Sequence, residues 1–183
     1  MDGSNLRFEW SSKKGWYKYG TRNRLMDESD PLFGQAIPIF EETLADRVEE
    51  IFVYKKYQRA ILFCEFWGLF SFAGNHEQGE HKRLTVIDLD VYKKGLVHPK
   101  ELVETFDVLI GSNYLGLRYW DKEFIDWVKE LEPKDDGGLQ CEGFVGKTEV
   151  KNKRIMKKIK TDWWYKTVYK KFEGSKATEI TRS

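Results

Sequence analysis

Three side chains in the C-terminal part of the sequence have the types and spacing to handle a phosphate group. Lys158 and Lys160 alternate within MKKIK (156 to 160), so a strand would project both ammonium groups from one face. Lysines fixed near phosphate oxygens stabilise the negative charge that builds there during group transfer. Glu142 opens EGFVGK, and a carboxylate among lysines can hold a divalent metal against phosphate oxygens. The alternatives are a solvated basic strand and a surface Glu–Lys pair, which commonly contributes little to stability.

A second carboxylate, Glu65, lies between bulky apolar residues in FCEFWG (63 to 68). A charged group in such a segment requires a partner, because burial without one is unfavourable. A salt bridge to Arg22 or Arg24, in the polar loop that follows residue 20, would supply that partner. The segment therefore contains either a binding residue or a structural ion pair.

The pattern of apolar residues predicts the strands and helices that position these side chains. Alternation at Leu6, Phe8 and Trp10 predicts a half-buried strand, and a turn at 11–15 makes it the first half of a hairpin. In chain order we expect strands at 6–10 and 16–19, a Pro/Gly-bearing stretch up to Pro38 and a helix over 41–58. Strands at 61–68 and 84–92 and a short helix from Pro99 follow. The last elements are a helix over 121–131, with Phe124, Trp127, Val128 and Leu131 facing inward, and strands at 139–147 and 154–161. Antiparallel strands with intervening helices predict the α+β class.

Length and composition fit one soluble domain over residues 1–183. The sequence is 40% hydrophobic and 33% charged, which argues against disorder, and its length permits a sizeable core. It contains no apolar run long enough to span a membrane and no N-terminal signal-peptide pattern. Cys64 and Cys141 lie in apolar, strand-like segments, so we expect free thiols in a reducing, cytoplasmic compartment.

The net charge of +1 conceals a basic segment near the end of the chain. Residues 147–171 contain ten Lys or Arg and two acidic residues, so they carry +8 and the rest of the chain −7. Aromatic residues interrupt this segment, which is either a folded surface that meets phosphates or a solvated face. Its end, DWWYKTVYKKF (162 to 172), either makes cationic and stacking contacts with nucleic acid or packs its rings against the domain.

Four short segments follow one another in an order that is typical of one superfamily. They are DGSN (2 to 5), FCEFWG, EGFVGK and MKKIK. In this order the chain resembles the covalent nucleotidyltransferases, and most closely their RNA-ligase-like branch, from residue 1 to about residue 160. The resemblance implies an α+β nucleotidyltransferase (ATP-grasp-like ligase) domain with antiparallel sheets and flanking helices. In that family a lysine in a KxxG motif attacks ATP, and the lysine-AMP adduct then passes its nucleotide to a 5′-phosphorylated end.

The resemblance assigns catalytic roles to three residues. Lys158 and Lys160 would contact the α-phosphate, and Glu142 would serve metal or nucleotide binding. The implied cofactors are ATP and Mg²⁺ or Mn²⁺, and the implied partner is RNA with nicked or 5′-phosphorylated ends. The family's chemistry would therefore be the ATP-dependent joining of RNA ends.

The resemblance also implies residues that bind the nucleotide. Glu65 would accept a hydrogen bond from a ribose hydroxyl, Asn5 would form one near the α-phosphate, and Arg22 would contact the nucleotide or its phosphates. Lys147 stands at the position of a family lysine. The chain departs from the family pattern at the residue that would stack on the nucleotide base. Relatives have an aromatic residue followed by aspartate there, whereas this chain has Ile87 followed by Asp88.

The first member of the KxxG motif does not lie within this sequence. Met1 stands at the first x and Gly3 at the glycine, so the nucleophilic lysine would lie one position before Met1. Lys13 and Lys14 follow the first strand and would need a different geometry. The chain is either a truncated or mis-started form of an active enzyme, which we favour because the other motifs are intact, or a relative without a nucleophile. As it stands, we predict that it does not self-adenylylate, and we expect no separate C-terminal domain.

Other function classes stay open. An mRNA-capping-type guanylyltransferase shares the lysine-nucleotide chemistry but uses GTP, and a non-catalytic nucleotide- or RNA-binding protein would use the basic aromatic segment alone. A metal site formed by His76, Glu77, Glu80 and His81 lacks a third ligand at a strong spacing, so a solvated loop is the favoured interpretation there.

Overall fold

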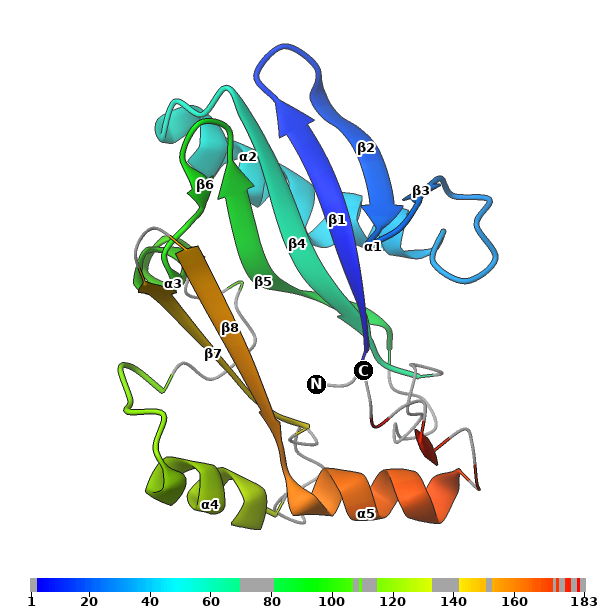
Figure 1. Cartoon of the computed structure of the whole chain (residues 1–183). Helices are drawn as coiled ribbons and strands as arrows, with labels where there is room; N and C mark the ends of the chain where they lie inside the picture. The colour runs from blue at the N-terminus through cyan, green and yellow to red at the C-terminus, as the bar shows by residue number, and fades with distance from the viewer. Residues whose placement is uncertain are drawn as a thin grey trace. The chain divides into compact units, whose positions relative to one another are not determined.

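The alternating apolar residues of the sequence build a six-stranded antiparallel sheet (Figure 1). The computed structural model describes residues 3–69, 81–106, 109, 115–132, 142–150, 153–172, 174, 177, 178 and 181. The chain forms two units, Gly3–Tyr114, which we call the sheet unit, and Leu115–Ser183, which we call the C-terminal unit. Both units combine antiparallel strands with helices, which confirms the predicted α+β class.

The strand order in the sheet unit is β3-β2-β1-β4-β5-β6. The strands are β1 (Gly3–Ser11), β2 (Gly15–Thr21), β3 (Leu25–Met26), β4 (Arg59–Trp67), β5 (Arg83–Val91) and β6 (Gly95–Leu96). The four strands that alternation predicted in this unit are thus confirmed, with slightly different ends. The first strand of the chain lies inside the sheet, between β2 and β4, so it is paired on both edges.

A helix in three segments covers one face of this sheet (Figure 1). The segments are α1 (Ala36–Phe40), the π-helical η1 (Glu41–Ala45) and α2 (Asp46–Tyr54). The predicted bounds of 41–58 are wrong at both ends. The helix begins earlier because Pro38 lies in its first turn, where the missing N–H is not needed. It ends earlier because Lys56 adopts a left-handed φ of 56°, which terminates α2.

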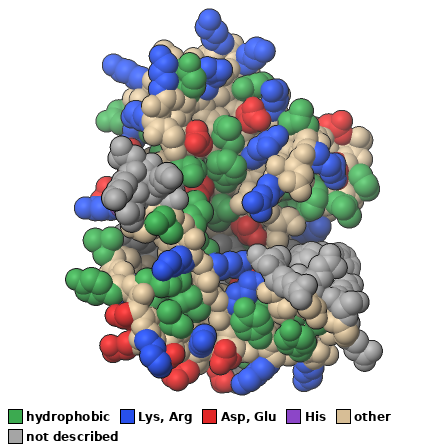
Figure 2. All heavy atoms as spheres, in the orientation of Figure 1, with side chains coloured by type: hydrophobic (Ala, Val, Ile, Leu, Met, Phe, Trp, Pro, Cys, Tyr) green, Lys and Arg blue, Asp and Glu red, His purple; other side chains and the backbone are tan. Residues whose placement is uncertain are grey.

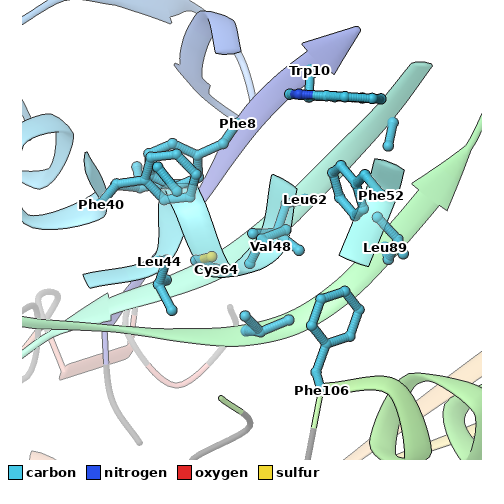
Figure 3. Close-up of a cluster of buried hydrophobic side chains, with 14 of the residues drawn as sticks. Phe8, Trp10, Phe40, Leu44, Val48, Phe52, Leu62, Cys64, Leu89 and Phe106 are labelled. Atoms are coloured by element: carbon cyan, nitrogen blue, oxygen red, sulfur yellow. The ribbon is translucent and has the colours of Figure 1, made fainter. Parts of the chain in front are cut away.

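The hydrophobic core of the sheet unit lies between the sheet and this helix (Figure 3). Alternate residues of β1 point into it, and Leu6, Phe8 and Trp10 are almost completely buried. The ring of Phe8 stacks on that of Phe40 with centroids 4.0 Å apart. Because such aromatic pairs add about 0.5–1.5 kcal/mol beyond their buried area, this layer holds the sheet rigidly. The other face of the sheet does not take part in this core, so its side chains are available for other roles.

A short helix, α3 (Pro99–Phe106), packs against β5 and contributes to the same core. It begins at Pro99, as predicted, and it buries Leu102 and Phe106. Proline is favoured at this position, because the first residues of a helix have no use for their N–H groups.

The C-terminal unit contains two helices and a two-stranded antiparallel sheet. Its elements are α4 (Lys122–Glu130), β7 (Gly143–Val150), β8 (Lys153–Lys160) and α5 (Asp162–Lys171). Asp121 caps α4 by accepting a hydrogen bond from the Phe124 N–H at 2.9 Å. Val128 is buried as predicted, but the inward prediction is wrong for Trp127, which is half-exposed. Its ring instead lies beside that of Phe144, with centroids 5.9 Å apart.

Some predicted features lie outside the described residues, namely Met1, Asp2, Cys141 and the loop residues His76, Glu77 and Glu80. Cys64 is a buried free thiol, and burial raises its pKa well above the usual range. Every helix in the described ranges is too short or too polar to cross a membrane. The single nucleotidyltransferase domain over residues 1–183 stays a prediction.

Candidate functional site

Glu142 and two lysines of β8 form a charged cluster in the C-terminal unit. The Glu142 Oε1 atom lies 2.8 Å from Lys158 Nζ and 3.3 Å from Lys160 Nζ. The side chain of Glu142 is 14% exposed, that of Lys158 43% and that of Lys160 6%. Two ammonium groups against one carboxylate leave an excess positive charge, which attracts an anion. We call these three residues the Glu142 cluster.

The pairing of β7 with β8 brings the cluster together. Gly143 lies opposite Lys160, and Val145 lies opposite Lys158. Directly opposed residues of an antiparallel pair project from the same face. A Cβ atom on Gly143 would lie 1.8 Å from the carbonyl oxygen of Ile159, and its φ is +153°. Only glycine permits so close an approach of the two strands beside Glu142.

The first turn of α5 supports Lys160. Thr161 is fully buried and caps the helix, because its Oγ1 accepts a hydrogen bond from the Trp164 N–H at 3.1 Å. The Thr161 N–H donates to the carbonyl oxygen of Glu142 at 3.0 Å. Lys160 Nζ lies 3.7 Å from the centroid of the Trp164 ring, a cation–π geometry. Sequence reasoning missed Thr161 and Trp164, although threonine and aspartate before an apolar run indicate a helix start.

Lys147 shares the face of the β7–β8 sheet that carries the cluster. It lies opposite Met156, two positions beyond the Val145–Lys158 pair. The opposite face carries Phe144, which packs beside Trp127, and Lys157, whose Nζ lies 5.9 Å from the centroid of the Trp120 ring. All three lysines predicted to act on phosphates therefore lie on one face of this sheet.

The sheet unit carries its own row of polar side chains, on the face opposite the core. Asn5 on β1 is the register partner of Glu65 on β4, and Glu65 is the partner of Thr85 on β5. We call these residues the Asn5 row. Thr85 is buried, and its Oγ1 accepts a hydrogen bond from Trp67 Nε1 at 2.9 Å. The structure therefore brings Asn5 and Glu65 together, and it adds Thr85, which no sequence pattern indicated.

Arg22 and Arg24 lie in the turn between β2 and β3, and both are exposed. Arg24 forms an ion pair with Asp30. The hydrogen bond from Arg24, with those from the Phe33 and Leu32 N–H groups, lowers the pKa of the Asp30 carboxyl to about 2. Arg24 is thus engaged within its own loop, which leaves Arg22 as the candidate of the pair for a ligand.

Asp88 lies on the same face as the Asn5 row. It is the register partner of Phe63, next to a bulge that separates the Phe63–Asp88 pair from the Cys64–Val86 pair. The extra residue of this bulge is Ile87, which is half-buried. A bulge changes the direction in which a side chain projects from a strand. Ile87 therefore lies at an irregular position of β5, at the place where the resemblance implies an aromatic residue.

Glu142 is the side chain of the cluster that could bind a divalent metal. No group of three or more His, Cys, Asp or Glu side chains lies within reach of one ion in the described ranges. Mg²⁺ is commonly bound by one or two carboxylates together with waters and substrate phosphates. Glu142 uses Oε1 for both lysine contacts. Among these residues, Glu142 could contribute one carboxylate oxygen to a metal whose remaining ligands come from elsewhere.

The sheet unit and the β7–β8 sheet together define the class of fold, and a solved structure shares it. No family model and no curated protein matches the sequence. The chain is similar in structure to a lysine-to-alanine mutant of the Naegleria gruberi RNA ligase with ATP and Mn, with a TM-score of 0.57 and 16% identity. The match covers 88% of this chain and 48% of the ligase, so the chain spans about half the length of its neighbour. The likeness shows that the chain has an RNA ligase-like fold.

Proposed function

We propose that this chain is an RNA ligase-like adenylyltransferase domain that binds ATP with a divalent metal and acts on RNA ends. The observation that carries the proposal is the Glu142 cluster, in which two lysines and a carboxylate meet on one strand pair. It occurs in a fold shared with an RNA ligase whose structure contains ATP and Mn. The reaction would be the joining of 5′-phosphorylated RNA ends through a lysine-AMP intermediate.

In this proposal the lysines stabilise charge on the α-phosphate. Loss of pyrophosphate from ATP places negative charge on the α-phosphate oxygens, and fixed ammonium groups lower the energy of that state. Lys160 is held by Glu142 and Trp164, so it is oriented before the nucleotide arrives. Lys158 is half-exposed and therefore the more accessible of the two cations. Glu142 would hold Mg²⁺ or Mn²⁺, which supplies Lewis-acid stabilisation of the phosphate oxygens when bound.

The remaining binding roles follow the same chemistry. Glu65 would accept a hydrogen bond from a ribose hydroxyl, and Asn5, its neighbour across β1 and β4, would donate near the α-phosphate. Arg22 and Lys147 would contact phosphates of the nucleotide. The side chains of Asn5 and Arg22 are exposed, so a ligand can reach them.

In this proposal adduct formation requires a lysine directly before Met1, at the first position of the KxxG motif. Two polypeptides test this, the sequence as printed and one with a lysine placed directly before Met1 and a start methionine before that. Incubated with α-labelled ATP and Mg²⁺, only the second should retain label after denaturation. An adduct on the first would overturn the prediction.

Nucleotide binding is tested separately by isothermal titration with ATP and Mg²⁺. Lys158→Gln and Lys160→Gln should each weaken binding by at least tenfold, since each removes a charge-assisted contact. Lys129→Gln, an exposed lysine of α4, is the matched control and should bind as the parent does. Tighter binding of GTP than of ATP would indicate a capping-type guanylyltransferase. RNA binding with no measurable nucleotide binding would indicate a non-catalytic RNA-binding protein.

A further inference from the structure

Seven basic side chains gather at the end of the sheet unit where three turns lie side by side. The turns join β1 to β2, α2 to β4, and β5 to β6. Backbone hydrogen bonds tie them together, from the Ser12 N–H to Gln58 O and from the Tyr92 N–H to Arg59 O, both at 3.0 Å. The exposed basic residues, which we call the three-turn surface, are Lys13, Lys14, Lys55, Lys56, Arg59, Lys93 and Lys94. Blue Lys and Arg side chains gather at this end in Figure 2.

This surface differs in charge from the rest of its unit. Residues 3–114 contain 15 Lys or Arg and 17 Asp or Glu, so the unit as a whole is slightly acidic. The turn segments 12–14, 55–59 and 92–94 contain the seven basic residues and no acidic one. Lys55 has an acidic neighbour on α3, with its Nζ 3.9 Å from Glu101 Oε1. The local excess of positive charge is therefore large and lies close to several backbone turns.

Tyrosine rings lie among these cations. The Arg59 guanidinium lies 3.9 Å from the centroid of the Tyr92 ring. Lys94 Nζ lies 5.3 Å from that of Tyr57. Tyr54, at the end of α2, is 84% exposed. Tyr57 is buried and Tyr92 is 44% exposed, so the rings on which bases can stack, beside cations that contact phosphates, are those of Tyr54 and Tyr92.

Two of the lysines occupy backbone positions that folding alone would give to glycine. Lys56 has a φ of 56° and Lys93 a φ of 68°, and these are the two non-glycine residues with positive φ in the described ranges. A side chain in this region destabilises the fold relative to glycine. Both exceptions are lysines, and both lie on the three-turn surface. Backbone preference therefore does not explain why lysine stands at these two positions.

We propose that the three-turn surface is a second nucleic-acid site, which binds the phosphate backbone of RNA away from the Asn5 row. The two places lie towards opposite ends of β1, and the six steps from Asn5 to Ser11 span about 20 Å at 3.3 Å per residue. That RNA is the nucleic acid rests on the proposed function. The surface would hold a stretch of RNA remote from the reacting end, without reading its sequence.

The chemistry of the turns favours RNA over an anionic bilayer. Surface-binding membrane segments insert Leu, Phe or Trp side chains beneath the headgroups. The turn segments contain no Leu, Ile, Phe or Trp, and their rings are tyrosines that contact cations. Cations with stacking rings are instead the combination found in sequence-independent binding of single strands.

The test measures the salt dependence of RNA binding. Fluorescein-labelled single-stranded RNA of mixed sequence is titrated without ATP at several salt concentrations, and log Kd is plotted against log salt. Lys56→Gly with Lys93→Gly should reduce the slope by about 1.4, because each lost phosphate contact with a single strand contributes about 0.7. The glycines suit the local φ, so thermal stability should be unchanged or higher. Arg47→Gln with Lys100→Gln removes the same charge outside the turns and should leave the slope unchanged.

Three results would overturn the proposal. The first is an unchanged salt slope for the double glycine variant, and the second is an equal reduction of the slope for the Arg47→Gln, Lys100→Gln control pair. The third is weaker binding of the double glycine variant to phosphatidylserine vesicles while its RNA binding is unchanged. The double glycine variant should bind ATP as the parent does. Failure of the proposed function would appear elsewhere, as ATP binding that Lys158→Gln and Lys160→Gln leave intact.

Discussion

The Glu142 cluster contains an ammonium group that is almost fully buried. Lys160 is 6% exposed, and its Nζ lies 3.3 Å from Glu142 Oε1, so loss of the carboxylate removes an anionic partner from a buried ammonium group. Breaking a buried ion pair in this way destabilises a protein by roughly 3–5 kcal/mol. We predict that Glu142→Gln lowers the free energy of unfolding by about 3 kcal/mol, the low end of that range, because Lys158 is half-exposed. Urea unfolding followed by circular dichroism measures the change.

A double-mutant cycle separates the two lysines. Lys160→Met should recover part of the stability lost in Glu142→Gln, because it removes the buried charge, whereas Lys158→Met should recover little. Equal coupling of Glu142 to both lysines would contradict the assignment of Lys160 as the buried partner.

The Asp30 carboxyl provides a prediction about pH. Its pKa is lowered from 3.8 to about 2, chiefly by the hydrogen bond from Arg24. Because its pKa is lower in the folded than in the unfolded protein, the ionised Asp30 carboxylate stabilises the fold at pH values above about 4. That stabilisation is lost as the pH falls from about 4 to about 2. Arg24→Gln should raise the Asp30 pKa towards 3.8, measured by carbon NMR titration of the carboxyl. Arg22→Gln, in the same turn, should leave it near 2; a rise there would show that Arg22 also contacts Asp30.

Site residues with a regular spacing could be predicted from the sequence, whereas site residues that depend on contacts between distant elements could not. Lys158 and Lys160 were found because alternation on a strand fixes their common face. Trp164 was missed because its place under Lys160 depends on how α5 starts, and Thr85 because it joins the Asn5 row only through the pairing of distant strands.

At the level of elements, Gly143 controls how β7 meets β8. A Cβ there would lie 1.8 Å from the Ile159 carbonyl oxygen, whereas one on Gly95 (φ +75°) would meet nothing within 4 Å. We predict that Gly95→Ala costs about 1 kcal/mol, the penalty for a left-handed alanine, and that Gly143→Ala costs several times more because the strands must separate. Hydrogen exchange of the β8 amides should accelerate in Gly143→Ala and not in Gly95→Ala. Equal costs would show that backbone conformation, rather than strand approach, selects glycine at position 143.

The ends of elements were the least predictable part of the fold. Period-two and helical patterns predicted the strands of the sheet unit and the existence of its main helix, because burial on one face dictates both patterns. The end of α2 could not be predicted, since Lys56 takes a left-handed conformation that lysine rarely adopts. The Pro/Gly-bearing stretch predicted to run up to Pro38 ends earlier, because proline fits the first turn of α1.

For the whole molecule, the sequence predicted the class but not the distribution of the core. The strand order β3-β2-β1-β4-β5-β6 requires pairing between distant residues, such as Asn5 with Glu65, 60 positions apart, and local patterns carry no information about such pairing. The main hydrophobic cluster belongs wholly to the sheet unit. The described residues of the C-terminal unit that are buried and apolar are Val128, Ile159, Trp164, Val168 and Ala177.

This unequal distribution predicts that the two units differ in stability. The C-terminal unit buries less apolar surface, so it should unfold at a lower urea concentration than the sheet unit. Two local probes distinguish them in a Cys141→Ser variant. Exchange of the β8 amides reports the C-terminal unit, and alkylation of Cys64 reports the sheet unit, because that thiol is buried with a raised pKa and reacts only after the core opens. We expect β8 exchange to become fast while Cys64 is still protected; coincident transitions would show one cooperative unit.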